Sequence, residues 1–222
     1  MATQLDLQEQ EQVDALKAFW KQYGNLITWT LTLALAAFAA WNGWNWYQRE
    51  QAVKASVMHD EIDQAVAAGD MAKAVRVFGD LRERFPGTSY AQQAGLALAK
   101  LQADKGDSAA AVATLAWVAE KAAEDEFRTL AQLRLAAIQL ESKKYDEAAK
   151  ALDAARAPGF EALVADRRGD LALAQGKRAE AVEAYRAAWK GLSDKVEYRQ
   201  LVEAKLTSLA AAPSAAASGA QP

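Results

Sequence analysis

Residues 163–188 read LVADRRGDLALAQGKRAEAVEAYRAA, and this stretch decides the fold. Two helix-forming halves flank a turn at Gly176. Small residues stand at Gly169 and Ala181, and the large residue Tyr185 follows Ala181 by one helical turn. A small residue allows two helices to pack closely, and a large one on the same helix face fills the space beside it. The stretch therefore predicts a helix–turn–helix hairpin.

The same pattern occurs four times along the chain: a turn, three or four residues, an alanine, and then a large apolar residue four positions later. The alanines are Ala74, Ala111, Ala148 and Ala181, which are 37, 37 and 33 residues apart. The large residues are Phe78, Leu115, Leu152 and Tyr185. Helix–turn–helix repeats of about 34 residues are typical of tetratricopeptide proteins. One hairpin cannot bury its apolar face alone, so we expect about four repeats to stack into an α-solenoid.

An all-α domain over residues 49–211 follows from this periodicity. We expect its first helix to run from about Arg49 to Ala68 and to continue the helix that precedes it. The following helices are predicted near 71–85, 88–104, 108–122, 124–142, 145–156, 160–175 and 178–190. A last helix at about 194–211 is predicted to cap the stack. Residues 212–222 are rich in alanine and other small residues, have nothing to bury, and are expected to form a disordered tail.

Residues 22–48 form a run of 27 amino acids without a charge. About 20 apolar residues suffice for a helix to cross a bilayer. Tyr23 and Trp44 stand near its ends, roughly 31 Å apart at 1.5 Å per residue, which suits aromatic belts at two membrane interfaces. The run therefore predicts a transmembrane helix. A cleaved signal peptide and a buried core helix are the alternatives. The acidic leader and the length of the run disfavour the signal peptide, and the length of the run and the aromatic residues at both ends disfavour the core helix.

Residues 1–21 are predicted to be a tail that precedes the span. Val13, Leu16 and Phe19 follow helical spacing, which fits either a short amphipathic helix at the interface or an extension of the spanning helix. Lysine and arginine are equally frequent on both sides of the span, so the positive-inside rule leaves the orientation open. Small residues inside the span predict a contact with another membrane helix, although they could also face lipid. They are Thr28, Thr32, Ala36, Ala39, Ala40 and Gly43.

Composition argues against several functions. The chain has no cysteine and a single histidine, His59, so neither a thiolate site nor a histidine cluster can form. The net charge of −3 offers no basic footprint for nucleic acid. No phosphate-binding glycine loop follows a strand. We therefore expect a protein that is not an enzyme, with no cofactor, metal or small-molecule substrate.

The first helices of the hairpins, here called the A helices, are expected to line a concave face of the solenoid. Alignment of the repeats predicts a mostly apolar partner-binding groove there, suited to a helix or an extended apolar segment. Its residues are Leu96, Lys100, Leu130, Leu133, Ala137, Leu163, Asp166, Asp170 and Leu173. The alternative is that several of these leucines belong to the core between repeats.

Two motifs resemble the YfgM family. The first is EQVDALKAFW at residues 11–20, which Tyr23 and Gly24 follow ahead of the span. The second is LVADRRGDLALAQGK at residues 163–177, and the likeness extends over residues 10–210.

The resemblance implies an ancillary subunit of the bacterial SecYEG translocon. It further implies an inner-membrane protein with a cytoplasmic N-terminus and a periplasmic repeat domain that associates with the membrane-anchored chaperone PpiD. Linking the translocon to periplasmic chaperones for exported proteins is then the expected function. The alternative is an envelope stress-response regulator that sequesters a signalling partner through the same groove.

Overall fold

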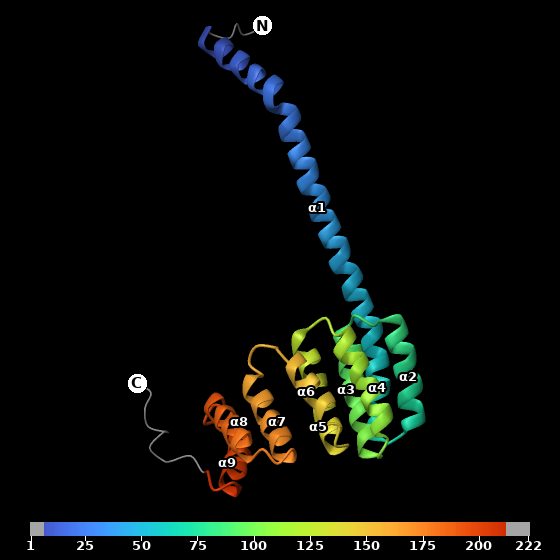
Figure 1. Ribbon diagram of the computed structural model, residues 1–222. Coiled ribbons are helices and arrows are strands. Elements are labelled where there is room, and N and C mark those ends of the chain that lie inside the picture. Colours follow the sequence, from blue (N-terminus) through green and yellow to red (C-terminus); the bar gives the residue numbers. More distant parts are fainter. Residues whose placement is uncertain (1–6, 212–222) are drawn as a thin grey trace. The chain divides into compact units, whose positions relative to one another are not determined.

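The computed structural model describes residues 7–211, which contain nine α-helices and no strand (Figure 1). The helices are α1 Leu7–Ala67, α2 Met71–Arg84, α3 Ser89–Asp104, α4 Ser108–Lys121, α5 Asp125–Glu141, α6 Tyr145–Ala154, α7 Glu161–Ala174, α8 Arg178–Gly191 and α9 Tyr198–Ser208. The predicted all-α class is confirmed, and every predicted helix of the repeat region has a counterpart. The predicted tail at 212–222 lies outside the described residues.

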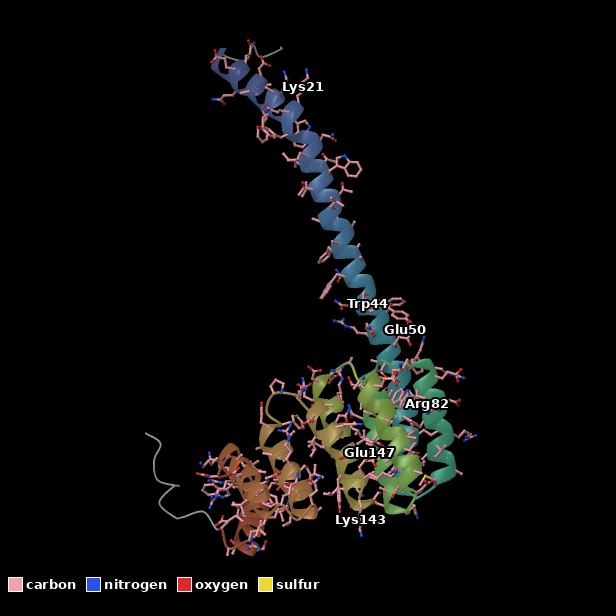
Figure 2. The ribbon with its side chains drawn as sticks, in the orientation of Figure 1. Lys21, Trp44, Glu50, Arg82, Lys143 and Glu147 are labelled. Carbon is pink, nitrogen blue, oxygen red and sulfur yellow. The ribbon has the colours of Figure 1, made fainter. Side chains whose placement is uncertain are left out.

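The chain divides into two units between Gln51 and Ala52. In the first unit, α1 is one continuous helix from Leu7, so residues 7–21 extend the apolar helix and form no separate amphipathic helix. Lys21 and Trp44 mark the two sides of its apolar stretch (Figure 2). Large apolar side chains in that stretch, such as Leu33 and Phe38, are about two-thirds exposed, at 66% and 67%. Among the described helices, α1 is the one long and apolar enough to cross a membrane.

The second unit is a row of antiparallel helix pairs that lie side by side in chain order (Figure 1). The part of α1 that follows Gln51 packs against α2 in a shared core cluster that includes Ile62 and Phe78. The pairs α3–α4, α5–α6 and α7–α8 form the next three hairpins. The second helix of each pair, α2, α4, α6 or α8, is here called its B helix. This arrangement matches the predicted solenoid.

Each hairpin turn uses the same backbone geometry. Gly69, Gly106 and Gly176 adopt positive φ angles of 67°, 83° and 77°, and Lys143 takes the equivalent position at 59°. The amide of the next residue then donates to a carbonyl five residues earlier, as Asp107 does to Gln102 at 2.8 Å. This bond satisfies a carbonyl at the end of the A helix, as in a Schellman motif. The repeated turn explains why the hairpins recur at similar spacing.

The predicted pattern of small and large residues packs the hairpins. The four repeat alanines are at most 1% exposed. A Cβ atom added at Gly169 would lie 2.5 Å from the Tyr185 ring, so only glycine permits this approach of α7 to α8. At the end of the stack, Val202 and Leu206 of α9 are fully buried against the last hairpin. Helix α9 thus caps the apolar end of the solenoid, although it begins at Tyr198 and is shorter than predicted.

Candidate functional site

The predicted groove residues lie on three A helices, α3, α5 and α7, but they differ in accessibility. Leu96 and Leu133 are only 5% and 6% exposed and belong to the core between repeats. Asp166 is fully buried. Lys100 and Leu173 are exposed, and four residues are half-buried: Leu130, Ala137, Leu163 and Asp170. Leu96 and Leu133 are therefore core residues, which was the alternative interpretation of the sequence. The accessible A-helix face is smaller than the predicted groove.

Asp166 and Asp170 are held by the cap helix α9. Lys205 Nζ lies 2.8 Å from Asp166 Oδ1 and 2.7 Å from Asp170 Oδ1. The Tyr198 hydroxyl donates to Asp166 at 2.6 Å, and the Tyr185 hydroxyl donates to Asp170 at 2.7 Å. These two aspartates therefore join α7 to α8 and α9, and their carboxylates are already occupied within the chain.

The electrostatics of this cluster favour an ionised Asp170 and neutral tyrosines. Burial by itself raises the pKa of Asp170, but hydrogen bonds from Lys205 and Tyr185 outweigh it and hold that pKa below its usual value. Burial and the neighbouring carboxylates raise the pKa of Tyr185 and of Tyr198 well above the ordinary tyrosine value. Each hydroxyl therefore stays a donor to its aspartate at neutral pH.

The lowered pKa of Asp170 predicts a loss of stability in acid. Because the folded state holds this pKa below its unfolded value, the stabilisation is complete above pH of about 4 and disappears as the pH falls through the folded pKa. Urea unfolding midpoints measured from pH 6 to pH 2 should therefore fall most steeply below about pH 4. The Asp170→Asn variant should show a shallower fall over the same range, and an unchanged slope would contradict the assignment.

Arg134, on α5, was missed by the sequence reasoning. It is half-buried, and its Nη1 donates to the carbonyl oxygen of Leu96 on α3 at 2.8 Å. No carboxylate pairs with it in the described range, and burial lowers its pKa. Arg167 stands 33 residues later on α7 but is paired with Asp170 at 2.8 Å. The repeat spacing could have revealed the two arginines, whereas only the structure shows that Arg134 lacks an acidic partner.

The single histidine lies on the part of α1 that belongs to the repeat domain. His59 Nδ1 is 3.4 Å from Asp63 Oδ2, and its ring meets Tyr90 edge-on with centroids 5.6 Å apart. The contact with Tyr90 connects α1 to α3, whereas the contact with Asp63 lies within α1. Both contacts give the histidine a structural role. The described part of the chain has no group of three side chains placed to hold a metal ion.

The residues predicted to contact another membrane helix are exposed along the apolar stretch of α1. The Thr28 and Thr32 hydroxyls donate to carbonyls four residues earlier, both at 2.8 Å, which satisfies them within the helix. Ala36, Ala39, Ala40 and Gly43 are exposed along the same stretch. Their contact with a second membrane helix remains a prediction.

Two cavities lie outside the predicted groove, at places where the sequence reasoning expected no site. One, of 350 Å³, is bordered by α4, α5 and α6 and includes Val112, Leu135 and Ala151. The other, of 560 Å³, is bordered by the α6–α7 loop, α7 and α8. The position and size of such cavities depend on where each helix ends and on how far apart neighbouring helices lie. The periodicity of the sequence alone determines neither.

These features define a helical-repeat protein of the tetratricopeptide class with an apolar N-terminal helix. Residues 17–211 match the family described as "Tetratricopeptide repeat-like domain". The chain is 30% identical over 184 residues to the "Ancillary SecYEG translocon subunit" of Escherichia coli (strain K12), covering 82% of this chain and 87% of that relative. A relative of the same name from Neisseria gonorrhoeae is 30% identical over 207 residues, covering 91% and 98%. The same name applies to a relative from Haemophilus influenzae that is 27% identical over 203 residues, covering 91% and 98%.

The chain therefore belongs to the YfgM family, which its two sequence motifs resemble.

Proposed function

We propose that this protein is an ancillary, non-catalytic subunit of the SecYEG translocon, anchored in the bacterial inner membrane by α1. The observation that carries the proposal is the likeness to relatives named as such subunits, which extends over 82–91% of the chain. The exposed apolar stretch of α1 supports a membrane anchor. A stack of helical hairpins supports a binding function, because such solenoids present extended surfaces to partners.

The proposed topology has a cytoplasmic N-terminus and a periplasmic repeat domain. The family resemblance favours this direction, since charges beside the span are balanced. A phosphatase reporter that folds only in the periplasm, fused after residue 211, should be active. Activity of a reporter that works only in the cytoplasm, at the same position, would overturn the orientation.

The proposed role of the repeat domain is to link the translocon to a periplasmic chaperone, with PpiD as the partner that the resemblance implies. The accessible A-helix residues Leu130, Ala137, Leu163 and Leu173 provide apolar contacts for it. Arg134 adds an unpaired cation beside them. A partner segment with an apolar face and a carboxylate would complement this surface.

Purification in a mild detergent tests both parts of the proposal. The intact chain should retain the SecYEG translocon and PpiD. Replacement of residues 22–48 by an unrelated spanning helix, which keeps the protein in the membrane, tests whether the span contributes to the translocon contact.

A Leu130→Glu, Leu173→Glu variant tests whether the A-helix face holds the chaperone. The control is Val75→Glu on α2, where the valine is also an exposed apolar residue. Failure of the intact chain to retain the translocon would refute the subunit assignment.

A further inference from the structure

The helix α6 is one turn shorter than the other B helices. It has 10 residues, whereas α2, α4 and α8 have 14 each. Pro158 follows its end closely, and Gly159 turns the chain with a φ of 86°, so the helix stops at Ala154. Four helical residues would rise about 6 Å. A non-helical segment, residues 155–160, takes the place of that turn before α7 begins (Figure 1).

The 560 Å³ cavity opens beside this segment. Its apolar lining comes from the loop, α7 and α8 and consists of Ala155, Ala157, Val164, Ala165, Ala184 and Ala187. An adjoining space of 220 Å³ shares Arg168 and Glu180 with it and lies farther along α7. The larger volume is within the range of about 300–1,000 Å³ that ligand pockets occupy. Because five of the six apolar residues in the lining are alanines, the cavity has room for a large side chain from a partner.

The charged side chains at this cavity leave an excess of negative charge. Arg168 is paired with Asp153 at 2.9 Å, and Glu180 lies 3.7 Å from Lys177. Glu161 and Glu183 also line the cavity, and neither has an ion pair in the part of the chain that the structure describes. Arg156 offsets one of these two carboxylates, so the balance stays acidic.

We propose that this cavity, bordered by the α6–α7 loop, α7 and α8, is a second docking surface and binds a basic, apolar segment of a partner protein. A leucine or phenylalanine side chain of the partner enters the alanine-lined space. A lysine or arginine one helical turn away pairs with Glu161 or Glu183. The surface is formed by the loop, α8 and the side of α7 that carries Glu161, Val164 and Ala165. None of its lining residues is among the predicted groove residues, so it does not depend on the partner assigned there.

The absence of cysteine from the chain allows a direct test by thiol protection. The full-length Ala187→Cys variant, in neutral maltoside micelles, is alkylated with a maleimide reagent alone and with each of two synthetic helical peptides. One peptide is built from leucine, alanine and lysine, and the other has glutamate in place of lysine. The control is Ala113→Cys, an exposed position on α4 that lies outside this cavity.

The lysine peptide should slow alkylation of the Ala187→Cys thiol by about fivefold more than the glutamate peptide, as expected for one or two exposed ion pairs. Neither peptide should protect the Ala113→Cys thiol selectively. Adding Glu183→Lys, an exposed change in the middle of α8, should remove the preference, and adding Glu161→Lys as well should reverse it. Equal protection by both peptides, no protection by either, or an unchanged preference in the lysine variants would overturn the proposal.

Discussion

Lys205→Met is expected to lower the free energy of unfolding of the last repeat and its cap by about 3–5 kcal/mol. Lys205 Nζ contacts both Asp166 and Asp170, at 2.8 Å and 2.7 Å, and Asp166 is fully buried. Removal of the cation leaves a buried carboxylate whose remaining charged neighbour, Arg167, is 3.7 Å away. The loss of an ion-pair partner in a buried site costs far more than the pair contributes when intact, because the surviving charge stays desolvated.

Urea unfolding followed by circular dichroism and by tryptophan fluorescence measures this effect, since Trp189 lies at the α8–α9 contact. The matched control is Lys195→Met, an exposed lysine near α9, which should change stability by less than about 0.5 kcal/mol. The double variant Asp166→Asn, Lys205→Met should be less destabilised than the two single effects added together, because both changes act on one contact. A Lys205→Met effect below about 1 kcal/mol would show that the cluster does not hold the cap.

Release of α9 would also change the surface of the solenoid. Val202 and Leu206 are fully buried against the last hairpin, so their departure exposes apolar surface at the end of the stack. Solenoids need a polar outer face on their terminal unit to remain soluble. Loss of Lys205 should therefore also increase self-association of the purified protein.

The repeat fold was predictable because its determinants are local in sequence. The turn glycines, the alanine one turn into each B helix and the large residue after it recur in register, so they fix both the hairpins and their order. Gly169 and Tyr185 show why the pattern carries this information, since a side chain at Gly169 would collide with the Tyr185 ring. The apolar stretch of α1 was predictable for the same reason.

The site was less predictable because it depends on distances between helices. Periodicity identifies the face on which Leu96 and Leu133 lie, but the separation of neighbouring A helices decides that both are buried. Asp166 meets its partner Lys205 across 39 residues of sequence. The 560 Å³ cavity is bordered by the loop that follows α6, and α6 ends at Ala154, two residues before the predicted boundary. Uncertainty of one turn at a helix end is enough to hide such a space.

The double variant Leu33→Arg, Ala36→Arg is expected to abolish membrane anchoring. Both positions lie near the middle of the uncharged run at 22–48 and are exposed along α1. An arginine at the centre of a spanning helix costs about 2.5–3.5 kcal/mol for insertion, so two should cost about 5–7 kcal/mol. Extraction of membranes with alkaline carbonate should release the variant, whereas the unaltered chain should stay in the pellet.

The control for this experiment is Leu33→Ala, Ala36→Leu, which exchanges the two side chains and keeps the hydropathy of the run. It should remain in the carbonate pellet. If the arginine variant is also retained, a membrane role for α1 would be refuted, because the repeat domain would then have to hold the protein at the membrane by itself. Release of the arginine variant together with loss of translocon co-purification would connect the anchor to the proposed function. Release with co-purification intact would instead place the translocon contact on the repeat domain.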